Sequence, residues 1–158
     1  MDEILKLLEE NGRISVEDLA AMTQKSEDEV RSVMKELEQS GTIIKYAAIV
    51  HPGNRSEKSV RAVIELQVTP ERDRGFDAIA EKIYHFPQVK SLYLISGGYD
   101  LQVAVEGSSI EDVALLTQKF ATIDGVRSTK TQFVLQIYKE NDIIYVPKEK
   151  DLRQEMMA

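Results

Sequence analysis

Hydrophobic residues recur every three or four positions from Ile4 to Leu37, which is the spacing of amphipathic helices. Polar residues that commonly cap helices divide this stretch into three parts. Ser15 precedes the second part, and Ser26 with Glu29 forms a capping box before the third. Asn-Gly at 11–12 tolerates a left-handed conformation and is expected to close the first helix, and Ser-Gly at 40–41 stops the third. Three short helices with a tight turn between the last two indicate a helix-turn-helix.

Beyond residue 41 the period of the hydrophobic residues changes to two, which is the period of a strand. The first strand is predicted at 42–50, before a turn at 51–54. Strand and helix patterns then alternate in the order β-α-β-β-α-β, at 61–68, 76–83, 89–95, 101–105, 109–120 and 126–138. Glu-Leu-Gln-Val at 65–68 recurs as Asp-Leu-Gln-Val at 100–103. This weak repeat is typical of two split β-α-β units that share one four-stranded sheet.

The fold class predicted from these patterns is α+β. It has a winged-helix-like helix-turn-helix domain at 1–42, a strand and linker at 43–57, a ferredoxin-like βαββαβ domain at 58–140 and a C-terminal tail at 141–158. Helices would cover one face of the sheet and leave the other bare. Because a broad exposed apolar sheet is rarely tolerated in a monomer, we expect at least a homodimer. The apolar part of the tail, 143–146, is expected to be a docking strand or a dimer contact.

Composition places the protein among soluble globular chains of the cytoplasm. Hydrophobic residues make up 42% of the chain and charged residues 30%, and there is no cysteine for a disulfide or a thiolate metal site. The N-terminus lacks the basic start and apolar run of a secretion signal, and no apolar stretch approaches membrane-spanning length. We therefore expect a cytoplasmic protein without a membrane partner.

The sequence offers no catalytic or metal-binding constellation. Its two histidines, His51 and His85, fall on different predicted elements and have no other ligands at metal spacing. Neither a nucleophile-base arrangement nor a phosphate-binding loop is present. We therefore expect neither an enzyme nor a bound metal or cofactor.

The charge balance bears directly on nucleic-acid binding. The net charge is -7, and residues 1–50 hold six basic residues against eleven acidic ones. This balance argues against nonspecific affinity for DNA, because the neutralisation of phosphates by lysine and arginine supplies most of the free energy of nonspecific binding. A dimer that docks one helix per half-site can still bind if its cations lie on the docking face. The candidate DNA contacts lie in and just before the third helix: Lys25, Ser26, Arg31, Ser32 and Lys35. The alternative is that these are ordinary solvated charges on a degenerate helix-turn-helix.

The turn Ser96-Gly97-Gly98-Tyr99-Asp100 is the best candidate for a ligand site. Its glycines let a ligand approach the backbone, Asp100 can take an ammonium group and the Tyr99 phenol can bond a carboxylate. Thr129 and Thr131 project from one face of the last predicted strand and are candidates to border the same pocket. The alternatives are a plain hairpin turn and two routine strand residues.

Two ordered groups of motifs resemble the Lrp/AsnC family of feast-or-famine regulators, over residues 3 to 138. The first group lies in the predicted helix-turn-helix: Ile4-Leu5, Asn11-Gly12-Arg13-Ile14-Ser15, Asp18-Leu19-Ala20, Ser26, Val30, Leu37-Glu38, and Gly41-Thr42-Ile43-Ile44 with Tyr46. The second group resembles the signature segments of the family's C-terminal effector and assembly (RAM, ACT-like) domain: Ser96-Gly97-Gly98-Tyr99-Asp100, and Gly125-Val126 with Thr129-Lys130-Thr131.

The resemblance implies a sequence-specific regulator of transcription that binds double-stranded DNA as a dimer and assembles further into octamers. It also implies an amino acid or related metabolite as effector, bound between subunits. Three positions depart from the family pattern. Gln24 stands where the turn before the last helix usually has glycine, Val33 where an arginine is common, and Gly98 where the effector turn often has an acid.

Two other interpretations of the sequence compete with the hypothesis of a transcription regulator. Sirohaem decarboxylases resemble this two-part architecture, but they use histidine and arginine around a tetrapyrrole, and the strand at 89–95 offers neither. A metabolite-sensing module with an inert helix-turn-helix would act through other proteins, and the acidic first turn of the third helix favours that alternative.

Overall fold

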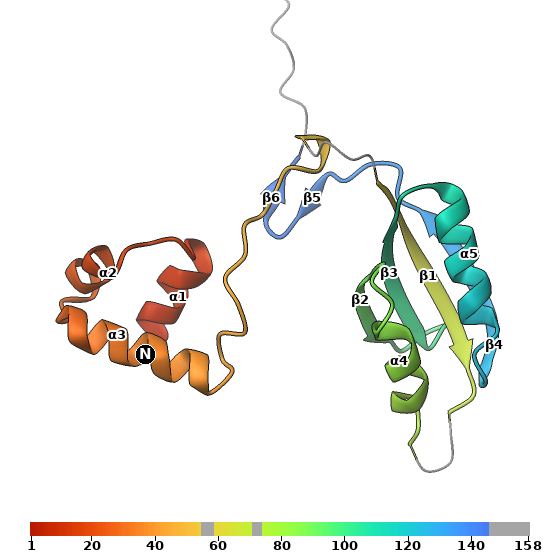
Figure 1. Cartoon of the computed structure of the whole chain (residues 1–158), viewed down its shortest axis with the longest axis horizontal. Helices are drawn as coiled ribbons and strands as arrows, with labels where there is room; N and C mark the ends of the chain where they lie inside the picture. Colours follow the sequence, from red (N-terminus) through yellow and green to blue (C-terminus); the bar gives the residue numbers. More distant parts are fainter. Residues whose placement is uncertain (55–58, 71–73, 146–158) are drawn as a thin grey trace, which may run out of the picture. The chain divides into compact units, whose positions relative to one another are not determined.

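The computed structural model describes residues 1–54, 59–70 and 74–145. The chain divides into two compact units, Met1–Pro52 and Gly53–Ala158, and each is described here by itself (Figure 1). No helix in the described part of the chain combines the length and the apolar character needed to cross a membrane.

Three helices form the first unit: α1 (Asp2–Glu10), α2 (Val16–Thr23) and α3 (Glu27–Gln39). The predicted caps are confirmed, because the Ser15 hydroxyl accepts a hydrogen bond from the amide of Asp18 and the capping box of Ser26 with Glu29 is complete. One small core joins the helices through buried Ile4, Leu8, Leu19, Ala20 and Val30. The helix-turn-helix predicted from the apolar spacing is therefore present.

The turns that follow α1 and α2 differ in their backbone conformation. Gln24 ends α2 in the left-handed conformation, with φ 53° and ψ 38°, and the amide of Lys25 donates to the carbonyl of Ala20 at 3.1 Å. The turn thus keeps its shape without glycine, at a cost of about 1 kcal/mol. The left-handed closure predicted after α1 is wrong. Asn11 has φ -144°, and its side-chain oxygen instead accepts from the amide of Arg13 at 3.0 Å.

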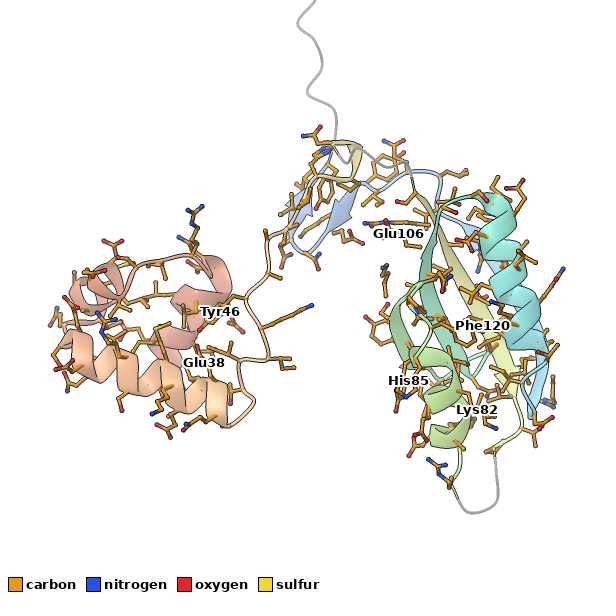
Figure 2. All side chains as sticks on the ribbon, viewed as in Figure 1. Glu38, Tyr46, Lys82, His85, Glu106 and Phe120 are labelled. Atoms are coloured by element: carbon orange, nitrogen blue, oxygen red, sulfur yellow. The ribbon has the colours of Figure 1, made fainter. Side chains whose placement is uncertain are left out.

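The segment after α3 does not form the strand that its pattern predicts. Residues 42–50 contain no strand, because a strand needs a partner for its backbone and none of the described residues pairs with this segment. The segment is instead tied to α3. The amide of Ile43 donates to Leu37 at 2.9 Å, and the Tyr46 hydroxyl donates to Oε1 of Glu38 at 3.1 Å (Figure 2). The short 3-10 helix η1 (Pro52–Asn54) follows.

The second unit is a four-stranded antiparallel sheet with two helices, as predicted. Its elements are β1 (Val60–Val68), α4 (Asp77–Tyr84), β2 (Val89–Leu94), β3 (Leu101–Gly107), α5 (Ile110–Ala121) and β4 (Val126–Phe133). The strand order is β2-β3-β1-β4, and α4 and α5 cover one face (Figure 1). Between them lies a core that includes Ile64, Leu66, Ile79, Val103 and Phe120. This is the ferredoxin-like arrangement of two split β-α-β units.

The face of the sheet away from the helices is mainly polar. Alternate residues of β1 and β3 point away from the core, and those on the open face are Arg61, Val63, Glu65, Gln67, Gln102, Ala104 and Glu106. All seven are half-buried rather than fully exposed. Among the described residues, the open face of the sheet is therefore not the broad apolar surface from which a homodimer was predicted.

The chain beyond β4 also differs from its prediction. The last strand was expected to reach residue 138, but it ends at Phe133, and a separate hairpin follows from β5 (Lys139–Glu140) and β6 (Ile143–Ile144). Asn141 and Asp142 form its turn with φ of 49° and 61°. Residues 143–146 were predicted to be a docking strand or a dimer contact; of these, 143–144 pair within this hairpin, and 146–158 lie outside the described residues. The Arg61 guanidinium binds the Glu140 carboxylate at 2.9 Å and so joins the hairpin to the sheet.

Candidate functional site

The third helix presents one apolar face and one polar face. Val30 and Leu37 are buried in the first unit, and Val33 and Met34 pack beside them. The five predicted DNA contacts are all exposed: Lys25, Ser26, Arg31, Ser32 and Lys35. Val33, which stands where the family commonly has an arginine, is therefore a packing residue here. Within the first unit, the outer face of α3 is exposed.

Ser26 has a structural task that limits its role in binding. Its hydroxyl accepts from the amide of Glu29 and donates to Oε2 of Glu29 at 2.7 Å, and its own amide donates to the same oxygen at 2.8 Å. These hydrogen bonds, the one from the Ser26 backbone first and that from its hydroxyl second, hold the pKa of the Glu29 carboxyl below its ordinary value. Ser26 thus fixes where the helix begins.

Arg31 is paired within its own helix. Its Nη2 lies 2.9 Å from Oε2 of Glu27, one helical turn earlier, and both side chains are about half exposed. The pair neutralises one of the three acids in the first turn of α3. Such exposed pairs are weak, so Arg31 can leave Glu27 for a phosphate. The side chains of Ser32 and Lys35 have no hydrogen-bond or ion-pair partner among the described residues.

The turn at 96–100 is held at the end of the sheet through Asp100. Oδ2 of Asp100 accepts from the amide of Val68 at 2.8 Å, and the Asp100 amide donates to Leu66 at 2.9 Å. The carboxylate therefore closes the end of β1 where the β-ladder stops. This contact occupies part of the group that was expected to take a ligand's ammonium.

Two residues that the sequence analysis missed lie beside this turn. Nε2 of Gln67 donates to the carbonyl of Gly98 at 2.8 Å, and its Oε1 accepts from Ser128 at 2.9 Å. Nζ of Lys130 lies 5.8 Å from the centre of the Tyr99 ring and 3.9 Å from Oε2 of Glu65. An amide and an ammonium group thus join the tyrosine and the glycine backbone at one edge of the open face.

Thr129 and Thr131 lie on the other face of β4. Oγ1 of Thr131 lies 3.0 Å from Oγ1 of Thr117 in α5, so this side chain points toward the helices. Thr129 shares its face, because side chains of a strand alternate, and Lys130 between them points to the open side. The structure therefore brings Ser96 to Asp100 together with Lys130 rather than with the two threonines. That alternation was the signal in the sequence that could have found Lys130.

Comparison with protein families assigns both units. Residues 3–44 match the winged helix-turn-helix DNA-binding model, and residues 61–144 match the Lrp/AsnC ligand binding domain. This chain belongs to the Lrp/AsnC family. The second match alone covers more than half of the chain, and the two matches follow one another in the order that the motifs predicted.

Relatives and solved structures agree with this assignment. The Lrp/AsnC protein is 40% identical over 153 residues to the uncharacterized HTH-type transcriptional regulator YugG of Bacillus subtilis, over 96% of this chain and 92% of that one. It is 25% identical to AsnC of E. coli, with a TM-score of 0.70 over 87% and 91% of the two chains. A complex of the regulator NMB0573 of Neisseria meningitidis with L-Met shares the fold, with a TM-score of 0.72 at 23% identity over 87% and 88% of the two chains.

The Lrp/AsnC protein is accordingly a transcriptional regulator, with a helix-turn-helix for DNA and a separate ligand-binding domain. The family and its named relatives are regulators and not enzymes, so the decarboxylase reading finds no support.

Proposed function

We propose that this Lrp/AsnC regulator binds duplex DNA with the outer face of α3 from each subunit of a homodimer. We also propose that an amino acid bound beside the 96–100 turn changes the affinity for DNA. The observation that carries the proposal is the exposure of every predicted contact, just before α3 and on α3 itself, in a helix whose opposite face is buried. The second helix of a helix-turn-helix is the one that enters the major groove.

The predicted contacts in and just before α3 have three different roles in DNA binding. Lys25, Arg31 and Lys35 neutralise phosphates and set the position of the helix on the duplex. Ser32 lies on the same outer face and reaches a base edge, where a hydroxyl can both donate and accept. Ser26 contributes by starting the helix at the right residue and by offering its backbone near a phosphate. Lys25, Arg31 and Lys35 are the cations that each subunit contributes to this surface, so a dimer is needed to double the number of phosphate contacts.

The effector site uses the groups gathered at the end of the sheet. An amino acid needs an anion or an acceptor for its ammonium and a cation or a donor for its carboxylate. Lys130 and the Tyr99 hydroxyl serve the carboxylate, and the backbone at Ser96, Gly97 and Gly98 lies open to the ligand. Asp100 attracts the ammonium while it holds the turn. Thr129 and Thr131 lie on the far side of β4, where the Thr131 hydroxyl meets that of Thr117 in α5, so they contribute to the position of β4 and not to the contact with the ligand.

An amino acid is the favoured class of ligand because two proteins of the same fold have been solved with one. The NMB0573 complex holds L-Met, and the feast or famine regulatory protein Rv3291c of M. tuberculosis is complexed with L-methionine, at a TM-score of 0.73 and 24% identity over 91% of this chain and 95% of that one. Gly98 leaves out the acid that the family often has in this turn. We therefore propose a ligand of the amino-acid class without a commitment to its side chain.

A homodimer, with further assembly into octamers, is supported by apolar side chains that each unit leaves uncovered. Ile44 is 89% exposed after α3, and Leu135 is 96% exposed after β4. Tyr138 and Ile144 are also exposed in the second unit. Exposed apolar surface of this kind commonly marks an interface. A regulator of chromosomal promoters of this kind works in the cytoplasm, which is the location that we propose.

The test is a gel retardation assay with the DNA upstream of the protein's own gene, with and without pooled amino acids. We expect a retarded band whose midpoint shifts when the effective amino acid is present, and a dimer or a larger species in sedimentation. Lys130→Ala should abolish the shift and leave retardation without amino acid unchanged. A folded, dimeric protein that retards no fragment at low salt would refute the DNA-binding role. An amino-acid response that Lys130→Ala retains in full would refute the proposed site.

A further inference from the structure

The first turn of α3 contains three consecutive acids, and two of them are already engaged. Glu27 is paired with Arg31 at 2.9 Å, and the Glu29 carboxylate is held by the Ser26 amide and hydroxyl. Asp28, between them, is exposed and has no hydrogen-bond or ion-pair partner among the described residues. Of the three carboxylates, the one at Asp28 is therefore the one that can meet an outside partner without first breaking a contact of its own side chain.

Asp28 also lies on the side of the helix that faces away from the core. With 3.6 residues per turn, Asp28, Ser32, Lys35 and Gln39 line up along one side, opposite the buried Val30 and Leu37. All four are exposed. In a docked helix-turn-helix the N-terminal residues of the recognition helix are the ones that reach base edges. Asp28 occupies that position, and Ser32 stands one turn behind it.

A free carboxylate on this surface is unfavourable beside phosphates unless it accepts a hydrogen bond from a base. In the major groove the N4 amino group of cytosine is the donor that suits an aspartate or glutamate. The N6 amino group of adenine has the N7 acceptor next to it, which repels a carboxylate. Resting on the proposed DNA-binding role of α3, we infer that Asp28 is a specificity-determining residue that reads a cytosine in each half-site. It makes the protein selective, because guanine and thymine offer the carboxylate no donor in the major groove and adenine places its N7 acceptor beside the N6 donor.

The inference predicts a particular change of base preference. Asn in place of Asp28 keeps the shape of the side chain but presents one donor and one acceptor, which suits N6 and N7 of adenine. The preferred base at one position of each half-site should therefore change from cytosine to adenine. At that position we expect the wild type to bind cytosine about tenfold more tightly than adenine, and Asp28→Asn to reverse the order.

The experiment is binding-site selection from a randomised duplex library, followed by titration of the selected duplexes with single-base changes. The full-length wild type, Asp28→Asn and Asp28→Ala are compared. Glu17→Gln is the matched control, because Glu17 is an exposed acid at the second position of α2, as Asp28 is in α3. Thermal unfolding by circular dichroism confirms that each variant is folded before selection.

We expect Asp28→Ala to lose the cytosine preference at that position, while Glu17→Gln selects the same motif as the wild type. If Asp28→Asn gains affinity for every duplex equally and selects the wild-type motif, Asp28 is only a solvated charge and the inference is overturned. If the folded wild type selects no motif at all, the proposed DNA-binding role fails, and the specificity of Asp28 fails with it. The two failures are thus distinguished by the wild-type selection alone.

Discussion

The ion pair between Arg31 and Glu27 makes the DNA affinity of the protein adjustable by one substitution. Their side chains are 56% and 47% exposed, and the atoms lie 2.9 Å apart at helical i,i+4 spacing. A pair of this kind is worth about 0.3–0.5 kcal/mol. Arg31 must give up this energy when it moves to a phosphate. Glu27→Gln removes the competition, so each helix should bind about twofold more tightly and a dimer about fourfold.

The assay is a fluorescence-anisotropy titration of one selected duplex with wild type, Glu27→Gln and a charge control. Glu36→Gln is that control, because Glu36 is an exposed acid of the same helix with no side-chain partner among the described residues. The gain should shrink as salt is raised, since the pair is exposed and screened. In an Arg31→Ala background the gain of Glu27→Gln should disappear. An equal gain in that background, or from Glu36→Gln, would show that only net charge matters and would refute the reasoning.

Three further predictions concern the rest of the molecule. Gly125→Ala should destabilise the protein by about 3 kcal/mol in urea unfolding, because Gly125 has φ +93° and an added Cβ would lie 2.8 Å from buried Ile79. Glu29→Gln should lessen the loss of stability on acidification in urea melts at several pH values. Ser26 lowers the pKa of Glu29, so the stabilisation is present at neutral pH and is lost as pH falls through that depressed value; an unchanged acid limb would contradict this. Gly98→Asp should fold normally, because nothing lies within 4 Å of its Cβ position, and should tighten calorimetric binding of the effective amino acid; weaker binding would oppose the proposed site.

Capping residues and hydrophobic spacing correctly predicted the helices and strands whose stabilising contacts join residues close together in the chain. The serines before α2 and α3 cap those helices as predicted, since a cap bonds to residues two or three positions away. Leu101, Val103 and Val105 are buried in the core, as expected from the alternation of hydrophobic residues along a strand. The turn at Gln24 is the limit of such rules. Its left-handed shape is kept despite an unfavourable residue, and the hydrogen bond from the Lys25 amide to the Ala20 carbonyl closes it.

The features that escaped prediction depend on partners distant in the chain. Residues 42–50 have the pattern of a strand, but pairing requires a second strand, and none in the described part of this chain supplies one. Lys130 joins the 96–100 turn because β1 lies between β3 and β4 and because side chains of β4 alternate between the two faces. The alternation could be taken from the sequence, but the contact with the turn depends on strands that are distant in the chain. The hairpin at 139–144 could have been predicted, because Asn141 and Asp142 are residue types that tolerate the positive φ of its turn.

The most direct test of the account is the loss of two cations from α3. The double variant Arg31→Ala, Lys35→Ala should bind its selected duplex at least tenfold more weakly, with a shallower dependence of affinity on salt. The matched control is Lys119→Ala, Arg127→Ala, which removes the same charge from exposed positions of the second unit and should bind as the wild type does. If the α3 double variant binds DNA as tightly as the wild type, the outer face of α3 is not the DNA-binding surface, and the helix-turn-helix is inert.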